Sequence, residues 1–410
     1  MLSLLMYLVL CAVSDTAFGE RELKLVTVLY RHGDRSALRA YPKDPYKETA
    51  WPQGFGQLSL EGMRQHFELG KMLRKRYRGY LSETYNHNEI FVRSSDRDRT
   101  LMSAQVNLAG LYPPDQSHAF DPTIKWQPIP VHTVPSKNEM LLVFPLHDCP
   151  RYTALMNETM DTDIYHNMTE TYKTFLEMVA NETGLGNVTV RTVWKVQDTL
   201  FCELKHNMTL PKWVTSEVME KLGILSDFSL RILFGVYKRE QKCRLQGGLL
   251  LDQILKNMSA VAKLDSKEQL RMIVYSAHDT TVAALQEALN VFNGLQPPYA
   301  SCHIFELFKE ENGSFSVAMF YRNDSRKDPY QLTLPGCDLY CPLQDFITLT
   351  KSVIPVDWEK ECQLDINVKE KDVIIGLAVW SSFLLLVVVF LSMLLCRQRD
   401  PANCCSRNMN

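Results

Sequence analysis

A strong charge of either sign is what this sequence most clearly lacks. Its 45 Lys and Arg residues are offset by 47 Asp and Glu residues, which gives a formal net charge of −2 over 410 residues. Proteins that bind nucleic acid, or membranes through a polybasic patch, usually carry an excess of basic residues. This sequence has no such excess, so binding to nucleic acid or to a membrane surface through basic residues is not expected. The sequence also has no internal repeat and no low-complexity segment. With 46% hydrophobic residues the chain can bury a large core, and we expect one or two domains.

Each end of the chain carries an apolar segment that is typical of targeting to or insertion into a membrane. The apolar stretch at 1–13 is too short to span a bilayer and precedes Ala17-Phe18-Gly19, which suits signal-peptidase cleavage after Gly19. Residues 373–396 form an uncharged run of 24 residues, roughly 36 Å of helix, which can cross a hydrocarbon core of about 30 Å. We therefore predict a signal peptide at 1–19 and a transmembrane helix at 373–396.

These two segments predict a single-pass type I membrane protein. Residues 20 to about 372 would then lie in the lumen or outside the cell, and residues 397–410 would form a cytosolic tail. Three cysteines would lie at the cytosolic membrane edge, where palmitoylation occurs. They are Cys396, Cys404 and Cys405.

The predicted lumenal part carries two further marks of secretion. Eight Asn-x-Ser/Thr sequons predict N-glycosylation at Asn157, Asn167, Asn181, Asn187, Asn207, Asn257, Asn312 and Asn323. The same part contains seven cysteines, namely Cys149, Cys202, Cys243, Cys302, Cys337, Cys341 and Cys362. Oxidising conditions favour disulfides, and an odd number leaves at least one cysteine unpaired or intermolecular. Zinc binding is the alternative for CDLYC (337–341), but the spacing is wrong and no histidine pair is nearby, so no metal is expected.

Three apolar segments each run into a polar turn. LKLVTVLY (23–30) precedes RHGDR, EIFVRSS (89–95) precedes DRDRT, and LRMIVYSA (270–277) precedes HDTT. The last two turns open helical patterns, and a serine of RSS is the expected helix cap. Repeated strand, turn and helix predict an α/β fold with a mostly parallel sheet, whose carboxyl edge gathers the turns. Residues 150–245, rich in sequons and helical stretches, are predicted to form a helical insertion.

The first turn places His32 between Arg31 and Arg35. Gly33 permits a sharp turn that lets His32 project from the strand, and the planar forks of arginine suit a phosphate group. Neighbouring cations disfavour the protonated imidazole, so the pKa of His32 should fall and the ring should stay nucleophilic in mild acid. The turn therefore predicts a histidine nucleophile beside a phosphate site. The alternative is a surface turn with incidental charges.

The other two turns supply an acid and more phosphate ligands. A phosphate dianion would raise the pKa of Asp279, so that this carboxyl group stays protonated and can protonate a leaving oxygen. His278 would hold a phosphate oxygen, and a phosphate at RSSDRDRT would meet an arginine together with the N–H groups of a helix start. The alternatives are a simple helix cap for His278 and Asp279, and charge pairing across a solvated helix start for DRDR (96–99).

At these residues the sequence resembles the histidine acid phosphatases, in particular the prostatic and lysosomal acid phosphatases. The resemblance rests on RHGDR, RSSDRDRT and YSAHDTT and covers roughly residues 21–365, including WPQGFGQL, WQPIPVHTVP and RLQGG. It implies a lumenal domain at 20–365 with a phosphoglycerate mutase-like α/β fold, and hydrolysis of phosphate monoesters without a cofactor. It also implies that His32 is the nucleophile that forms a phosphohistidine and that Asp279 is the proton donor. The implied phosphate clamp is Arg31, Arg35, Arg99 and His278.

The resemblance implies further features away from this site. The implied disulfides are Cys149–Cys362, Cys202–Cys302 and Cys337–Cys341, which leaves Cys243 free. A homodimer is implied, with Trp126 and His132 at its interface. Trp194 resembles a tryptophan position that lines the substrate pocket, and a core aromatic is the alternative. The sequence departs from the family pattern at two places. Ala37 stands where the pattern has proline. The predicted cytosolic tail has no tyrosine and no dileucine, which does not favour delivery to lysosomes over the plasma membrane or endosomes.

Acid phosphatase activity is the leading hypothesis. A transferase of the phosphomutase type is disfavoured because secretion and disulfides do not suit a metabolic enzyme. A catalytically silent ectodomain with a role in adhesion or reception is the alternative from another class, and the presence of His32 and Asp279 speaks against it. Nucleotides, phosphotyrosine proteins and lipid phosphates remain open as substrates, so a nucleotide-selective or protein-tyrosine-selective phosphatase is a further alternative.

Overall fold

The computed structural model describes residues 21–115, 119–146, 148–263, 270–364 and 368–399. The predicted signal peptide, most of the predicted tail, and Cys404 and Cys405 lie outside these ranges. The described chain divides into a compact unit that ends at Cys362 and a second unit that contains helix α14.

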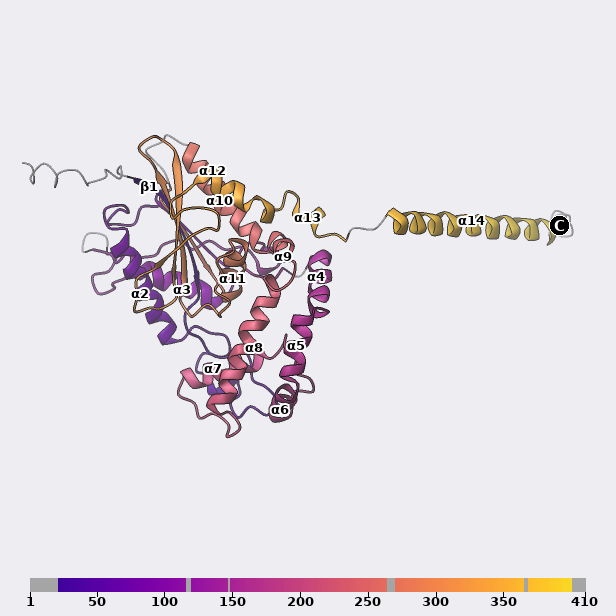
Figure 1. Cartoon of the computed structure of the whole chain (residues 1–410), viewed down its shortest axis with the longest axis horizontal. Coiled ribbons are helices and arrows are strands. Elements are labelled where there is room, and N and C mark those ends of the chain that lie inside the picture. Colours follow the sequence, from indigo (N-terminus) through magenta and orange to yellow (C-terminus); the bar gives the residue numbers. More distant parts are fainter. Residues whose placement is uncertain (1–20, 116–118, 147, 264–269, 365–367, 400–410) are drawn as a thin grey trace, which may run out of the picture. The chain divides into compact units, whose positions relative to one another are not determined.

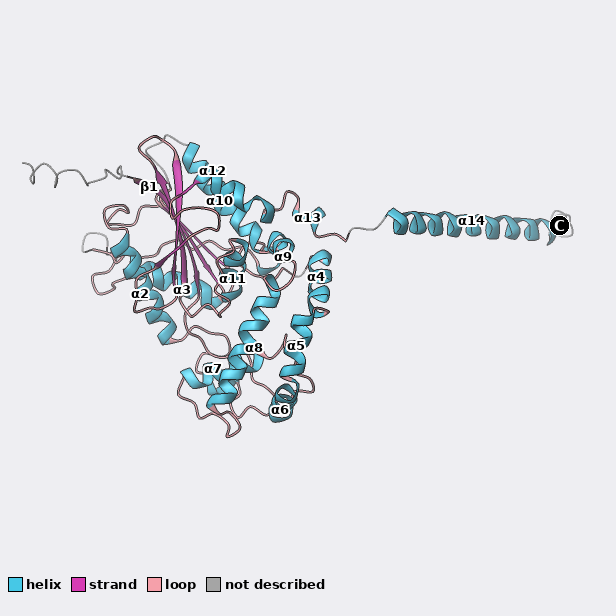
Figure 2. Cartoon of the chain, viewed as in Figure 1, coloured by secondary structure: helices cyan, strands magenta, loops and turns pink. Residues whose placement is uncertain are grey.

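A seven-stranded sheet forms the centre of the compact unit (Figures 1 and 2). The strands are β1 (Glu22–Arg31), β2 (Ile90–Ser94), β3 (Met272–Ala277), β4 (Cys302–Lys309), β5 (Phe315–Arg322), β6 (Tyr330–Leu332) and β7 (Cys341–Pro342). Their order is β2-β3-β1-β4-β5-β6, and β7 pairs with β5. The pairs β2–β3 and β3–β1 are parallel, as predicted, whereas the pairings of β4 to β7 are antiparallel. The expected α/β sheet is therefore mixed, because a hairpin of β4 and β5 adds to one side of the parallel strands.

Strand β1 is apolar along most of its length because both faces of the sheet are covered. Leu25 and Leu29 belong to the core on one face, and Val26, Val28 and Tyr30 belong to the core on the other. Alternate side chains of a strand point to opposite faces, so a strand buried on both sides reads as a continuous apolar run.

Helices pack on both faces of the sheet (Figure 2). The helices of the compact unit are α2 (Leu60–Arg76), α3 (Asp98–Leu111), α4 (Pro150–Met160), α5 (Asp163–Thr171), α6 (Lys173–Thr183), α7 (Trp194–Lys205), α8 (Ser216–Phe234), α9 (Arg239–Leu245), α10 (Gly247–Lys263), α11 (Asp279–Ala288), α12 (Leu343–Thr350) and α13 (Trp358–Glu361), with short 3₁₀ turns at Glu48–Ala50, Ser136–Asn138 and Lys351–Val353. Helices α2 and α3 cover one face, and α10, α11 and α12 cover the other.

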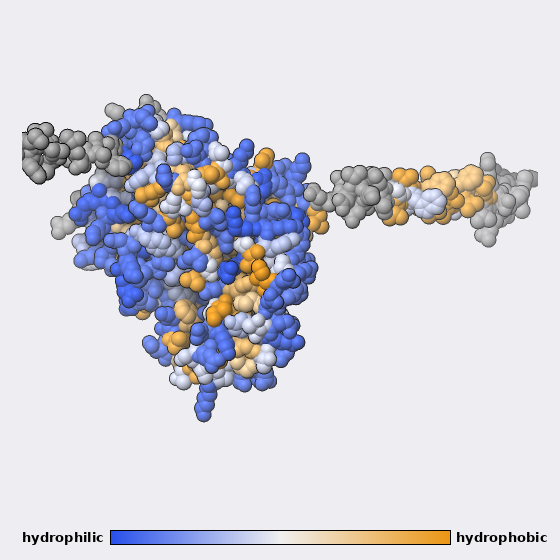
Figure 3. Space-filling view, in the orientation of Figure 1, coloured by the Kyte–Doolittle hydropathy of each residue, from blue (hydrophilic) through white to orange (hydrophobic). Residues whose placement is uncertain are grey.

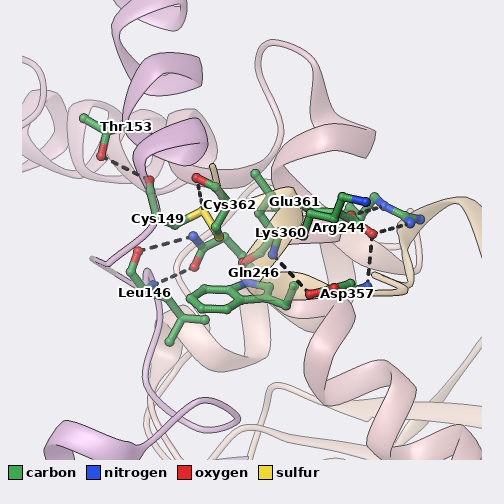
Figure 4. Close-up of a disulfide and its surroundings, with 11 residues drawn as sticks. Leu146, Cys149, Thr153, Arg244, Gln246, Asp357, Lys360, Glu361 and Cys362 are labelled. Carbon is green, nitrogen blue, oxygen red and sulfur yellow. Dashed lines mark hydrogen bonds and ion pairs between the residues drawn. A yellow bond between two sulfur atoms is a disulfide. The ribbon is translucent and has the colours of Figure 1, made fainter. Parts of the chain in front are cut away.

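Residues 150–245 are helical, as expected for the insertion. They form α4 to α9, and buried side chains of α4, α6, α7 and α8 share a core of their own, which includes Leu155, Val179, Leu200 and Leu225. A disulfide between Cys149 and Cys362, 213 residues apart, ties the start of this region to the end of the compact unit (Figure 4). The side chain of Gln246 hydrogen-bonds both backbone groups of Leu146 beside it.

The cysteine pairing differs from the expectation at one pair. Cys337–Cys341 is formed like Cys149–Cys362, and Cys243 is a buried free thiol, as expected. The expected Cys202–Cys302 disulfide is wrong, because both residues are buried free thiols. The physical reason is their placement: Cys202 on α7 packs with Ala37 and Trp51, whereas Cys302 at the start of β4 belongs to the sheet core beneath α2 and α3.

Helix α14 (Val368–Arg399) forms the second unit. Its stretch Gly376–Leu394 is long and apolar enough to cross a membrane and lies within the predicted span of 373–396. Its visible surface is largely apolar (Figure 3). Length and composition therefore fit a membrane anchor that follows a folded domain.

Candidate active site

The three polar turns predicted from the sequence meet at one edge of the sheet. The parallel register aligns the ends of β1 and β3, where Arg31 is opposite Ala277, and it aligns Ser94 at the end of β2 with Ser276. A cavity of about 2110 Å³ opens at this edge, beside α7 and α8. All six predicted site residues line it, namely Arg31, His32, Arg35, Arg99, His278 and Asp279.

His32 directly follows β1 and is held by its backbone and its ring. Its N–H donates to Ala277 at 3.0 Å, and its carbonyl accepts from the N–H of Ala300 at 3.1 Å. Nδ1 of His32 lies 2.8 Å from the carbonyl oxygen of Gly33. A carbonyl oxygen only accepts, so Nδ1 carries the hydrogen and Nε2 of the neutral ring keeps a free lone pair.

Gly33 is required by space rather than by a left-handed backbone. A Cβ atom built on Gly33 would lie 2.4 Å from the carbonyl oxygen of Gly62, and a Cβ on Gly62 would lie 2.1 Å from that of Asp34. The loop after β1 and the first turn of α2 therefore touch through backbone atoms. Gly33 was expected to permit a sharp turn; in the structure its role is instead to let the two backbone segments approach closely.

The pKa of His32 lies well below its ordinary value. Burial is the largest cause, because the side chain has almost no contact with solvent, and the positive charges of Arg99, Arg31 and Arg35 add to it. The direction agrees with the expectation, but desolvation outweighs the neighbouring cations. The imidazole is therefore neutral in mild acid and available as a nucleophile.

Arg31 links the first turn to the third. Its Nη2 lies 2.9 Å from Oδ2 of Asp279, its Nη1 donates to the carbonyl of Pro297 at 2.6 Å, and its guanidinium stacks 4.3 Å from the ring centre of Tyr299. Burial raises the pKa of Asp279, but the charges of Arg31 and Arg35 outweigh it, so the net pKa is lowered. Without a bound anion, Asp279 is therefore ionised rather than protonated.

Arg35 and Arg99 complete the cationic lining. Nη2 of Arg35 lies 2.8 Å from Oδ1 of Asp198 on α7. Arg99 has no ion-pair partner within the described ranges, and burial followed by the charge of Arg35 lowers its pKa to about 10. The Nε atoms of Arg31, Arg35 and Arg99 are all buried without a hydrogen-bond partner. Unpaired buried donors of this kind suit a bound anion.

His278 is fixed through a serine of the second turn. Its Nε2 lies 2.9 Å from Oγ of Ser95, which in turn lies 2.9 Å from Oγ1 of Thr100. Burial, followed by the charge of Arg99, lowers the pKa of His278 to about 3. The expected role of Ser94 or Ser95 as the cap of α3 is wrong, because Arg97 holds that position.

Sequence reasoning missed two residues of the site. Tyr299 stacks on Arg31, and its ring centre lies 5.9 Å from that of His32. Asp198 positions Arg35 from 163 residues away in the chain. The Pro-Pro-Tyr turn was a local signal for Tyr299, whereas a lone aspartate on a helix gives no signal for Asp198. Trp194 at the start of α7 lines the same cavity, as expected.

The predicted interface residues do not line this cavity, and His132 lies at the sheet edge formed by β2. Trp126 is 38% exposed and packs against Phe120, and His132 is exposed and stacks on Phe91 at 5.0 Å. His132 also extends the edge, because its N–H and carbonyl hydrogen-bond Val92 and Ser94.

A cluster of metal-binding side chains is absent from the part of the chain that the structure covers. No three His, Cys, Asp or Glu side chains among those residues are grouped so that they could hold a metal ion.

Three comparisons with known proteins agree with this geometry. Residues 22–322 match the profile of the histidine phosphatase superfamily (branch 2). The chain is 56% identical to lysosomal acid phosphatase from Rattus norvegicus, over 96% of this chain and 92% of that protein. It is 49% identical to prostatic acid phosphatase from Homo sapiens, over 85% of this chain and 90% of that protein. The fold is similar to Hafnia alvei phytase in complex with tartrate, with a TM-score of 0.63 at 16% identity over 84% of this chain and 99% of the phytase.

Proposed function

This chain belongs to the histidine phosphatase superfamily, and from that premise we propose that it is an acid phosphatase that uses His32 as nucleophile and Asp279 as proton donor. The observation that carries the proposal is the bond from Nδ1 of His32 to Gly33, which leaves Nε2 free to attack inside a cavity whose lining includes Arg31, Arg35 and Arg99. The alternative of a silent ectodomain is not favoured, because the relatives are named as phosphatases and both residues are in place.

In the first half-reaction, Nε2 of His32 attacks the phosphorus of a phosphate monoester. The nitrogen–phosphorus bond forms, the bond to the ester oxygen breaks, and the leaving oxygen takes its electron pair together with a proton from Asp279. In the second half-reaction, a water molecule attacks the phosphohistidine while the Asp279 carboxylate accepts a proton from it. The nitrogen–phosphorus bond breaks, and phosphate and neutral His32 are regenerated.

The arginines and His278 would act on the phosphoryl oxygens. Arg31, Arg35 and Arg99 each have a buried Nε without a partner, and Arg99 has no carboxylate neighbour in an ion pair among the described residues. Their charges would stabilise the negative charge that spreads over the equatorial oxygens in the transition state. Asp198 and Tyr299 would hold Arg35 and Arg31 in place.

Substitution of His32 tests this mechanism. His32→Ala should abolish hydrolysis, and rapid quenching of the wild type without acid should trap a phosphohistidine that the variant lacks. His166→Ala on α5, an exposed histidine outside the cavity, is the matched control and should remain active. EDTA should leave wild-type activity intact. Loss of activity in EDTA that added metal restores would instead indicate a metal-activated water.

We further propose that the enzyme acts outside the cytosol from a single membrane anchor. The apolar helix α14 and the membrane-anchored arrangement predicted from the sequence support a signal peptide at 1–19, a lumenal domain at 20–365 and a cytosolic tail at 397–410. The eight sequons support N-glycosylation of the lumenal domain. The exposed side chains of Trp126 and of His132, which stacks on Phe91 at the β2 edge, support a homodimer.

A further inference from the structure

Two of the eight predicted glycosylation sites lie on the wall of the proposed active-site cavity. Asn207 follows α7 and Asn323 follows β5, and both line the cavity that contains His32. The other six sequon asparagines do not line it; they are Asn157, Asn167, Asn181, Asn187, Asn257 and Asn312. A glycan attached at Asn207 or Asn323 would therefore start from the wall of the cavity.

Asn323 is held at the same sheet edge as His32. Arg322, the last residue of β5, is opposite Cys302, which is itself opposite Tyr30 of β1. The guanidinium of Arg322 donates to the carbonyls of Ser325 and Lys327, so the loop that carries Asn323 is tied back to the strand. A group attached to Asn323 therefore starts from a fixed point beside the cavity.

Asn207 is held by the helical wall of the cavity. It lies two residues after the end of α7 and has a φ of 58°, a left-handed conformation that asparagine tolerates better than most residues. The preceding His206 has its Nε2 2.9 Å from Oδ2 of Asp34, and its ring packs edge-on against Trp51 at 5.1 Å. This second attachment point is thus also fixed relative to the loop that carries His32.

Both asparagine side chains are available for modification. Neither side-chain amide makes a hydrogen bond within the described ranges; Asn207 is exposed and Asn323 is partly exposed. Asn257 on α10 differs, because its Nδ2, the atom that would carry a sugar, lies within hydrogen-bonding distance of the Tyr275 hydroxyl at 3.3 Å. Glycans at Asn207 and Asn323 would be bulky and hydrated, and they would occupy the solvent in front of the cavity.

We propose that N-glycans at Asn207 and Asn323 act as a size filter that admits small phosphate monoesters and disfavours phosphorylated protein surfaces. The filter rests on the proposed phosphatase function. A small ester can pass a mobile oligosaccharide without displacing it. A folded or extended protein must push both glycans aside to bring a phosphorylated side chain to His32, and this displacement reduces kcat/KM for that substrate class.

The test removes each sequon through its hydroxyl residue, because replacing Asn207 itself would strain its left-handed backbone. Thr209→Ala and Ser325→Ala are combined in the full-length chain. Ser314→Ala is the matched control, since it removes the sequon at Asn312 before the opposite end of β5. The substrates are nitrophenyl phosphate and phosphorylated α-casein, and mass spectrometry of the glycopeptides measures site occupancy in each protein.

The double variant should raise kcat/KM for phosphorylated casein on the order of tenfold, equivalent to about 1.4 kcal/mol, while nitrophenyl phosphate hydrolysis and the control variant stay unchanged. An unchanged ratio between the two substrates would overturn the filter, as would unmodified Asn207 and Asn323 in the wild type. Neither result affects the phosphatase assignment. That assignment fails separately, if the wild type does not hydrolyse nitrophenyl phosphate at all.

Discussion

Nη2 of Arg31 lies 2.9 Å from Oδ2 of Asp279, so the residue before the proposed nucleophile binds the proposed acid. In the free site this contact favours the ionised carboxylate, whereas proton donation requires the neutral acid. A phosphoryl group that binds Arg31 brings negative charge next to Asp279 and opposes this effect. We therefore expect a bound ligand to control the protonation of the acid, in part through this shared arginine.

Anion binding is expected to be coupled to proton uptake by Asp279. Burial raises the pKa of Asp279, but Arg31 and Arg35 outweigh it and leave the pKa lowered in the free site, and a bound anion would raise it again. Affinity for an anion should therefore rise as the pH falls toward the ordinary aspartate pKa of about 4. Calorimetric titration with sulfate, which does not titrate in this range, in two buffers of different ionisation enthalpy measures the protons taken up. Asp279→Asn should remove that uptake, and equal uptake by the variant would contradict the coupling.

The leaving group should decide how much Asp279 matters. Nitrophenolate departs without a proton, whereas the alkoxide of an alkyl phosphate needs one in the transition state. Asp279→Asn keeps the shape and removes the acid, so alkyl phosphates should slow about 10²–10⁴-fold more than nitrophenyl phosphate. The measurement is the wild-type to variant ratio of kcat/KM across a leaving-group series. If that ratio stays flat as leaving-group pKa rises, Asp279 is not the donor, and the buried carboxyl group of Asp34 is the next candidate.

A buried carboxyl pair behind the cavity wall should make stability depend on pH. Glu203 on α7 is fully buried beside Asp44, and burial followed by the charge of Asp44 raises the pKa of Glu203 from 4.5 to about 8. A folded-state pKa above the unfolded value favours folding below about 4.5, and that contribution is lost as the pH rises toward 8. The free energy of unfolding should fall by up to about 1.4 kcal/mol per pH unit within this window.

Glu203→Gln keeps a neutral side chain of similar shape and should flatten this dependence. The free energy of unfolding of the wild type and of the variant is measured by urea unfolding at several pH values between about 5 and 8. This range lies between the ordinary and the raised pKa of Glu203. Glu220→Gln on the exposed side of α8 is the control and should keep the wild-type slope. Parallel slopes for wild type and Glu203→Gln would show that Glu203 does not ionise in this range.

The long-range disulfide should contribute far more to stability than the free thiols. Cys149–Cys362 closes a span of 213 residues, so Cys149→Ser should cost about 2–5 kcal/mol and impair secretion. Cys243→Ala loses no cross-link and should cost less than about 1.5 kcal/mol. Among the seven cysteines between residues 20 and 372, thiol labelling of the denatured, unreduced protein should mark Cys202, Cys243 and Cys302. Protection of Cys202 and Cys302 would restore the pairing that the resemblance implied.

The parts of the site that follow the strands could be predicted from the sequence, because each is local. A strand buried on both faces, followed at once by RHGDR or HDTT, fixes both the strand and the position of its charged end. The supporting contacts could not be predicted in this way. Asp198 reaches Arg35 across 163 residues, and Ser95 reaches His278 across 183, and no spacing rule connects residues so far apart.

The sheet was predicted only in part. The parallel strands β1, β2 and β3 are each followed by a charged turn that marks the strand end. The buried hairpin of β4 and β5 has a different local signal, Asn312-Gly313 with a φ of 82° at the glycine, which sequence reasoning missed. The free thiols Cys202 and Cys302 show the opposite error. The resemblance to the acid phosphatases implied a disulfide between them, but the structure places the two side chains in separate cores.

The backbone contact between Gly33 and Gly62 has a consequence for how such a site can vary. Because no side chain separates the two segments, mutations in the residues around them change what the cavity recognises without altering the spacing that places His32. Helices α7 and α8 pack in a core of their own and line the cavity, so substitutions of their cavity-lining side chains other than Asp198 are expected to leave that spacing unchanged. Substrate preference and the placement of the nucleophile are thus expected to be separately mutable at most positions, whereas substitutions at Asp198, which holds Arg35, or at the two glycines would affect both at once.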